Sequence, residues 1–349
     1  MEDICNLYQQ SLIPDTELVN DATKQLLSIY ENPENISLIF QVINEVPDNS
    51  IKRTALAGLY RMMEVHWISF YNENQVGETI KEQLLLLFEN FQKDELIANN
   101  VAACLLPVIK TLGWEWAELI NFLSQTISVS TIKVVSYLLY HSIEFTENLS
   151  PEIINFCLSI LDESINKNDI QLIICSSNVF ALLSSFLHEE YSEVLIKFLN
   201  IYMSVFSENP NVELANSIGK SFNVNNTFID VDSLLMRLIE LSTQSDPQIY
   251  YITIRKLISK LGKNLRERFP FLLNSTIDII SSLFSEDCYL QESDSNYIAG
   301  VASKCAKRCN TDDFTSLITE LYSTPRKTIQ ELYSILEITH NIIDFININ

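Results

Sequence analysis

Residues 51–67 (IKRTALAGLYRMMEVHW) restrict the possible folds of this chain more than any other segment. Read at a helical period, the segment carries two apolar rows and, between them, a narrow and mostly polar strip. The first row is Ile51, Ala55, Leu59, Met62 and His66, the second is Leu56, Tyr60, Met63 and Trp67, and the strip is Arg53, Ala57, Arg61 and Glu64. A helix with two apolar faces must lie between neighbours on both sides, as in a stacked helical array or inside an ordinary helical bundle. The segment by itself leaves these two alternatives open.

Segments with helical patterns recur from one end of the chain to the other, separated by short breaks. The predicted helices are 2–11, 15–31, 34–46, 51–67, 76–92, 95–111, 114–128, 131–143, 151–166, 170–187, 190–207, 211–221, 230–242, 247–261, 266–285, 293–308, 313–322 and 326–345. They form about nine pairs in 349 residues, or roughly 39 residues a pair, which is typical of HEAT and armadillo arrays. An Asp recurs in the turn before the second helix, as Asp15, Asp48, Asp94, Asp169 and Asp246, and we expect it to cap that helix. The sequence therefore predicts an all-α fold, an α-solenoid of HEAT-type helix pairs.

Acidic residues outnumber basic ones by 45 to 23, which gives a net charge of −22. The excess is concentrated in residues 1–200, which hold 27 acidic and 10 basic residues. A field of this sign repels nucleic acid and anionic membranes and favours a basic protein partner. Because such charge also keeps a long apolar array dispersed in water, solubility is the alternative explanation.

The residue patterns that common catalytic and cofactor sites need are missing from the sequence. The six glycines stand far apart, which excludes the Rossmann and P-loop motifs. The four histidines form no HExxH motif and no Cys/His set with zinc spacing. We therefore expect no enzymatic activity, no cofactor and no metal.

No apolar run reaches the roughly 18 residues that span a bilayer. The seven cysteines, an odd number without a signal peptide before them, indicate a reduced intracellular protein.

Several stretches of the N-terminal part resemble the importin-β (karyopherin-β) family. They are LYQQSLIPD at residues 7–15, DATKQL at 21–26 and IKRTALA at 51–57, followed by Trp67. A further stretch, GWEWAELINFL at residues 113–123, resembles the start of that family's fourth repeat. The importin-5-like branch is the most similar. The resemblance covers residues 1–145, and beyond them only the helical period supports it.

Two features depart from the family pattern. Leu59-Tyr60-Arg61 stands where family members carry Leu-Lys-Asn, and members generally run to more than twice this length. We therefore expect either an N-terminal piece or a reduced member. The resemblance implies that residues 1–67 form the family's first two repeats and that residues 68–349 hold further HEAT repeats, within a single array over residues 1–349.

The resemblance also implies a right-handed superhelix, with the second helix of each pair on the concave side, and a nuclear transport receptor found in the cytoplasm, the nucleus and at the nuclear envelope. Members bind the GTP form of the GTPase Ran through their first concave helices. The residues expected to face Ran by position are Asn20, Lys24, Arg53, Arg61, Glu64, Asn99 and Lys110. An acidic concave wall would attract basic protein cargo, and grooves between first helices would take Phe-Gly nucleoporins. Each residue taken singly also fits an ordinary solvated surface.

The same helical period fits a function of a different class, a HEAT-repeat scaffold or assembly protein with no link to Ran. Only the N-terminal resemblance favours transport.

The predicted last helix, 326–345, and the residues after it stay apolar, although the terminal repeats of a solenoid normally expose a polar face. We expect another chain, a partner or the array itself to cover this helix.

Overall fold

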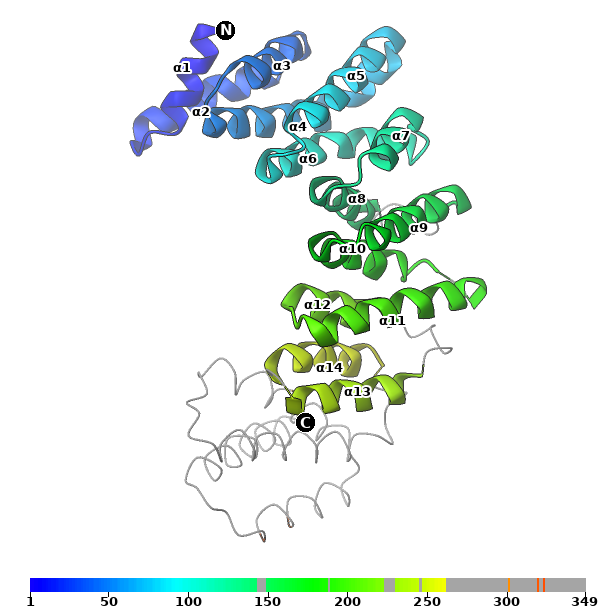
Figure 1. Ribbon diagram of the computed structural model, residues 1–349. Coiled ribbons are helices and arrows are strands. Elements are labelled where there is room, and N and C mark those ends of the chain that lie inside the picture. Colours follow the sequence, from blue (N-terminus) through cyan, green and yellow to red (C-terminus); the bar gives the residue numbers. More distant parts are fainter. Residues whose placement is uncertain are drawn as a thin grey trace. The chain divides into compact units, whose positions relative to one another are not determined.

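The computed structural model describes residues 1–142, 149–187, 189–222, 230–244 and 247–261, with the single residues Val301, Thr319 and Ser323. In these ranges it contains fourteen α-helices, two short 3-10 helices and no β-strand (Figure 1). The α-helices are α1 Glu2–Ser11, α2 Thr16–Tyr30, α3 Ile36–Glu45, α4 Asn49–Asn72, α5 Asn74–Phe91, α6 Glu95–Leu112, α7 Ala117–Gln125, α8 Val129–Ser142, α9 Pro151–Asn166, α10 Ile170–Leu183, α11 Ser192–Glu208, α12 Val212–Ser221, α13 Val231–Gln244 and α14 Pro247–Leu261. The chain divides into two compact units, Met1–Val179 and Phe180–Asn349, with the division inside α10.

The predicted all-α fold, with its alternation of helix and short break, is confirmed throughout the described ranges. Four of the predicted helix boundaries differ by three residues or more. The helix α4 continues beyond residue 67 to Asn72, α7 spans Ala117–Gln125 rather than 114–128, and α10 ends at Leu183 rather than at residue 187. The four predicted helices between residues 266 and 345, which include the apolar last helix, lie outside the described residues. The single array over residues 1–349 and its right-handed winding remain predictions.

Aspartates cap the N-terminal ends of the second helices, as the sequence predicts. Asp15, Asp48 and Asp94 each accept hydrogen bonds from the backbone N–H groups two and three residues further on, over 2.7–3.3 Å. Asp169 accepts one such bond, of 2.9 Å, at the start of α10. These bonds satisfy N–H groups that the first turn of a helix leaves without a partner, and each cap contributes about 1 kcal/mol. Asp246 lies outside the described residues.

The helices of the N-terminal unit form two layers. The first helices α3 and α5 pack against the second helices α4 and α6 that follow them, and α1 packs in the same way against α2. The second helices also pack on one another in the order α2, α4, α6, α8. Figure 1 shows α4, α6 and α8 following one another on one side, with α5, α7 and α9 on the other. Because the backbones of successive second helices approach more closely than those of first helices, the second-helix layer is the inner side of the curve in this unit.

The helix α4 is enclosed on both sides as its two apolar rows predict. Both rows are buried, with Tyr60 and His66 half-buried at their edges, and the strip of Arg53, Ala57, Arg61 and Glu64 is exposed. At the edge of this strip, Tyr60 donates a 3.2 Å hydrogen bond to the Glu64 carboxylate one turn further on. The structure thus supports the stacked array over the ordinary bundle for this part of the chain.

A glycine allows α2 and α4 to approach. A methyl group on Gly58 would overlap the ring of Tyr30, the last residue of α2. The Tyr30 hydroxyl donates a 3.1 Å hydrogen bond to the buried Tyr8 hydroxyl of α1, and His66 Nε2 donates to the Tyr30 carbonyl oxygen over 3.1 Å. Burial raises the pKa of Tyr8, and the two phenols remain neutral at ordinary pH. This cluster joins α1, α2 and α4 around the ring of Tyr30.

Two buried tryptophans stand before α7 rather than inside it. Trp114 donates a 3.1 Å hydrogen bond from Nε1 to the Ser142 hydroxyl at the end of α8, and its ring lies 6.4 Å from that of Phe156 in α9. Trp116 is also buried, and the Lys81 ammonium of α5 lies 5.9 Å from its ring centroid. The two rings therefore hold the start of α7 against α5, α8 and α9.

The second unit repeats the same arrangement over the described part of its chain. The first helices α11 and α13 pack against the second helices α12 and α14, and α12 packs closely on α14. Gly219 faces α14, where an added methyl group would lie 2.8 Å from the Cβ atom of Lys256. The buried Thr253 hydroxyl donates a 3.0 Å hydrogen bond to the Ala215 carbonyl oxygen across the same contact, and Lys256 donates to the Asn216 side chain.

The cysteines that the structure describes are free thiols, as the sequence predicts. Cys104, Cys157 and Cys175 are buried and Cys5 is half-buried. Of the helices in the described ranges, none combines the length and the hydropathy needed to cross a bilayer.

Candidate functional site

The seven residues expected to face a partner all lie in the second-helix layer of the N-terminal unit, and all seven are exposed. Asn20 and Lys24 are on α2, Arg53, Arg61 and Glu64 are on α4, and Asn99 and Lys110 are on α6. We call the exposed side of α2, α4, α6 and α8 the second-helix surface. The order of packing α2–α4–α6–α8 makes this surface continuous.

The second helices α4 and α6 run parallel and in register on this surface. The Asn49 amide at the start of α4 donates a 3.3 Å hydrogen bond to the Asp94 carboxylate at the start of α6. Halfway along the same pair, the Cys104 thiol lies 3.5 Å from the Leu56 carbonyl oxygen. Equivalent positions of the two helices therefore lie side by side, and residues near their C-terminal ends face the same region.

Two tyrosines converge near the middle of the surface. Tyr60 on α4 and Tyr137 on α8 are both half-buried and flank Cys104 of α6. Burial, the adjacent Glu64 carboxylate and the nearby Tyr137 raise the pKa of Tyr60, and burial beside Cys104 raises that of Tyr137. Both phenols are therefore neutral hydrogen-bonding groups at physiological pH. Tyr137 also packs against His141 one turn later, with ring centroids 4.5 Å apart and ring planes tilted by 57°.

Basic residues collect on the second helices of the N-terminal unit. Along their full lengths, α2, α4, α6 and α8 carry 6 basic and 4 acidic residues, whereas α1, α3, α5, α7 and α9 carry 1 basic and 10 acidic residues. The described helices of the second unit show the same trend, with 4 basic and 1 acidic residue on α12 and α14 against 2 basic and 4 acidic on α11 and α13. Within the described helices, the acidic excess therefore belongs to the first helices and not to the second helices.

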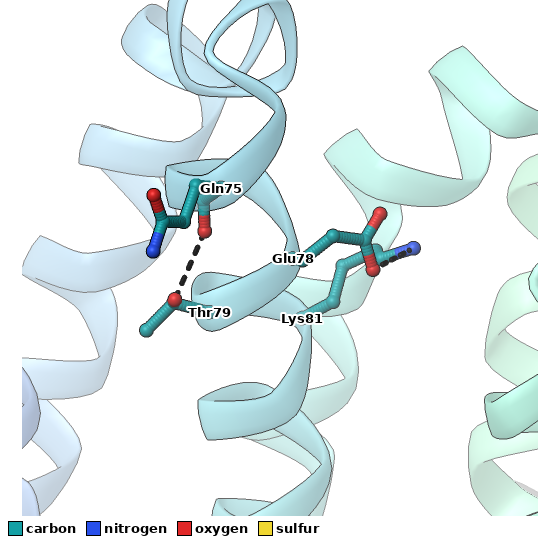
Figure 2. A network of polar contacts seen from close by, with 4 residues as sticks. All are labelled: Gln75, Glu78, Thr79 and Lys81. Atoms are coloured by element: carbon teal, nitrogen blue, oxygen red, sulfur yellow. Dashed lines mark hydrogen bonds and ion pairs between the residues drawn. The ribbon is translucent and has the colours of Figure 1, made fainter.

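The single cation of the first-helix layer is neutralised within its own helix. Figure 2 shows Lys81 on α5 beside Glu78, one turn earlier, in an ion pair of 2.8 Å. In the same view, the Thr79 hydroxyl donates to the Gln75 carbonyl oxygen. By contrast, Lys24, Arg53, Arg61 and Lys110 form no ion pair with any residue that the structure describes. The exposed cations of the second-helix surface are thus available to an external anion.

The acidic concave wall that the sequence predicts is not found on the described second helices. Total charge cannot show which helices carry it, and the first helices of the N-terminal unit hold 10 acidic residues against 4 on the second helices. Exposed apolar residues near the C-terminal ends of the second helices were not predicted as part of this surface. Val65 and Ile68 of α4 and Tyr140 of α8 are 63%, 57% and 57% exposed. They follow Arg61 and Tyr137 at helical spacing, and this spacing was the available signal.

Hollows lie between successive first helices in both units. The larger, of about 590 Å³, lies between the N-terminal ends of α7 and α9, and its lining includes Trp114, Ile120, Ile153, Glu115 and Glu152. Hydrogen bonds from its own backbone N–H and from Ser150 lower the pKa of Glu152, so its carboxylate stays ionised. A smaller hollow of about 280 Å³ lies between α11 and α13. In the described ranges, no cluster of three His, Cys, Asp or Glu side chains could hold a metal ion.

No protein-family model matches the chain, and no curated protein sequence matches it. Its fold does match solved structures. A crystal structure of Kap121p carrying three acidic-to-lysine mutations aligns with a TM-score of 0.69 and 11% sequence identity, over 98% of this chain and 37% of that one. Kap121p is a member of the karyopherin-β family, so the likeness establishes a karyopherin-like HEAT fold. This chain spans little more than a third of the length of Kap121p.

Proposed function

We propose that this chain is a karyopherin-type nuclear transport receptor, which carries protein cargo between the cytoplasm and the nucleus. The observation that carries the proposal is the likeness of its fold to Kap121p over 98% of the chain. The stretches of importin-β-like sequence, such as residues 51–57 on α4, support the same conclusion. Proteins of this fold work by binding other proteins, so the partners are proteins rather than small substrates.

The second-helix surface is the proposed site for Ran in its GTP form. Asn20 and Lys24, then Arg53, Arg61 and Glu64, then Asn99 and Lys110 form successive rows on α2, α4 and α6. Rows of exposed polar side chains on a rigid helical layer give a partner many weak contacts in fixed register. Arginines in such a surface are the side chains most often found to dominate binding.

Basic cargo and nucleoporins would bind elsewhere on the molecule. Cargo rich in Lys and Arg finds complementary charge on the acidic first helices, and not on the concave face for which the sequence predicted it. The hollow between α7 and α9, with Trp114, Ile120 and Ile153 in its lining, offers an apolar site for a phenylalanine of a Phe-Gly nucleoporin. These contacts would place the protein at the nuclear envelope as well as in the cytoplasm and the nucleus.

A pull-down with Ran locked in its GTP and GDP forms tests the proposal. We expect the full chain to retain the GTP form of Ran. It should lose this binding when Arg53→Glu and Arg61→Glu are combined, because the two new carboxylates would repel the acidic groups of Ran that the two arginines attract. Lys93→Glu reverses one charge at an exposed position in the turn between α5 and α6 and serves as the control for each of the two substitutions made singly. Absent binding, or equal binding of the two nucleotide forms, would leave the alternative of a HEAT scaffold without a link to Ran.

A further inference from the structure

The exposed side of α4, α6 and α8 combines features that occur together nowhere in the first-helix layer of the N-terminal unit, as far as the structure describes it. Arg61 and Lys110 are exposed cations without an ion pair to a described residue. Val65, Ile68 and Tyr140 expose large apolar side chains near the same ends of these helices. Arginine, tyrosine and aliphatic side chains together form the kind of surface that dominates protein–protein binding.

These groups lie within reach of one ligand. The helices α4 and α6 are parallel and in register, and α8 packs on α6 with Tyr137 beside Cys104. The helix ends that carry Val65, Ile68, Lys110 and Tyr140 therefore face the same region. Successive packed helices lie roughly 8–10 Å apart. Two turns of an α-helix rise about 11 Å, so carboxylates about seven residues apart on a bound helix would meet cations on neighbouring second helices.

We propose that the second-helix surface over α4, α6 and α8 binds an acidic amphipathic helix of another protein. Its carboxylates pair with Arg61 and Lys110, and its apolar residues cover Val65, Ile68 and Tyr140. The neutral hydroxyl of Tyr137 donates a hydrogen bond to its polar edge, whereas that of Tyr60 already donates to Glu64. This partner class is opposite in charge to the one that the total charge of −22 predicts.

The charge distribution favours an acidic protein segment over a nucleic acid. A polynucleotide carries a negative charge at every residue and would extend beyond these few cations. It would then meet a molecule with a net charge of −22, whose field repels a long polyanion. A short helix with a few carboxylates and an apolar side matches the mixed surface without this penalty.

Selection from a phage-displayed library of random 16-residue peptides on the full chain tests the proposal. We expect enriched peptides with Asp or Glu and with Leu, Ile or Phe at helical spacing. Synthetic copies, measured by fluorescence anisotropy, should bind about tenfold more weakly to the Arg61→Glu, Lys110→Glu double variant. They should bind within about twofold of the parent to Lys93→Glu, and raising the salt should weaken them because it screens the charges.

Several results would overturn the proposal. They are enrichment of basic or neutral peptides, no enrichment, or acidic peptides that bind the double variant as well as the parent. Displacement of the peptides by poly(dT), or stronger binding to phosphatidylserine vesicles, would assign the surface to another class of ligand and overturn it too. The inference shares Arg61 and Lys110 with the surface proposed for Ran, but this experiment contains no GTPase, so the two proposals can fail separately.

Discussion

The two helix layers of the N-terminal unit are built from the same helix-and-turn unit and yet differ in what they expose. The first helices expose carboxylates, and their one lysine is paired with Glu78 on the same helix. The second helices are enclosed by neighbours on both sides, and the narrow strips left open carry apolar side chains and the exposed cations Lys24, Arg53, Arg61 and Lys110, which form no ion pair with a described residue. The comparison teaches that the charge of the chain as a whole does not give the charge of each helix layer.

The close approach of second helices should be the most sensitive feature of this comparison. Gly58→Ala places a methyl group into the ring of Tyr30, which is held by its hydrogen bond to Tyr8. Overpacking of this kind costs about 1–3 kcal/mol, and the better helix propensity of Ala offsets up to about 1 kcal/mol. We expect a net loss of about 2 kcal/mol in the free energy of unfolding, measured by urea denaturation.

Gly219→Ala is the matched control for that variant. Its methyl group would lie 2.8 Å from the Cβ atom of Lys256, which is a smaller overlap than that of the Gly58 methyl group with the Tyr30 ring. We expect less than half of the Gly58→Ala effect. Equal losses in the two variants would show that the approach of α2 and α4 has no special importance.

The next largest effect is expected from the hydrogen bond that links the start of α7 to the end of α8. Ser142→Ala removes the acceptor of the buried Trp114 Nε1–H, which is left without that partner, and we expect a loss of about 1–2 kcal/mol. Ser124→Ala removes a hydroxyl that is exposed and bonds only within α7, and it should change stability by less than about 0.5 kcal/mol. Thermal unfolding followed by circular dichroism would compare the two, and similar melting temperatures would contradict the assignment.

Buried thiols give the fold a dependence on alkaline pH. Burial raises the pKa of Cys157 in α9 to about 12, from an ordinary value near 9. The thiol therefore stays protonated in the folded chain, while the unfolded chain ionises it above about pH 9. Stability should be complete below that pH and fall as the pH rises towards 12, by up to about 1.4 kcal/mol per pH unit for this group.

Urea denaturation at pH 8 and pH 10 measures this effect. The parent should lose about 1 kcal/mol more between the two pH values than Cys157→Ala does. Between pH 6 and pH 8 the two proteins should change in parallel, because the thiol is neutral in both states there. A parallel change up to pH 10 as well would show that Cys157 ionises in the folded chain.

The smallest effect is expected from the ion pair of the first-helix layer. Glu78→Gln removes the partner of Lys81, but the pair is only one turn apart on one helix and Glu78 is well exposed. Such pairs contribute about 0.3–0.5 kcal/mol, so the thermal midpoint should hardly move. A loss above about 1 kcal/mol would mean that Lys81 has a larger role at the Trp116 ring than the distance of 5.9 Å suggests.

The sequence was sufficient to predict the helices, but not where some of them end or which helix layer carries the negative charge. The period of apolar residues and the capping aspartates predicted the helices, because both signals are local. The end of α4 was missed because the exposed Val65, Ile68 and Tyr71 break no helix, and the first break after them comes at Glu73. Trp114 was expected inside α7, yet its ring is fixed by Ser142 of α8, a contact that no local pattern shows.

The candidate surface was predicted in part for the same reason. The exposure of Arg53, Arg61 and Glu64 follows from the two apolar rows of α4. Which helix layer holds the carboxylates, and which side of the curve that layer occupies, depends on packing between repeats. The acidic inner wall was an inference from total charge, and only the arrangement of the helices could correct it.

Lysine footprinting tests most directly the claim that the second-helix surface is the binding face. The full chain, free and saturated with GTP-locked Ran, would be acetylated with a water-soluble reagent and analysed by mass spectrometry. Protection of Lys24 on α2 and Lys110 on α6, with unchanged modification of Lys93 in the α5–α6 turn, is the predicted result. Unchanged modification of Lys24 and Lys110 on addition of Ran, or protection of Lys93 alone, would contradict the account.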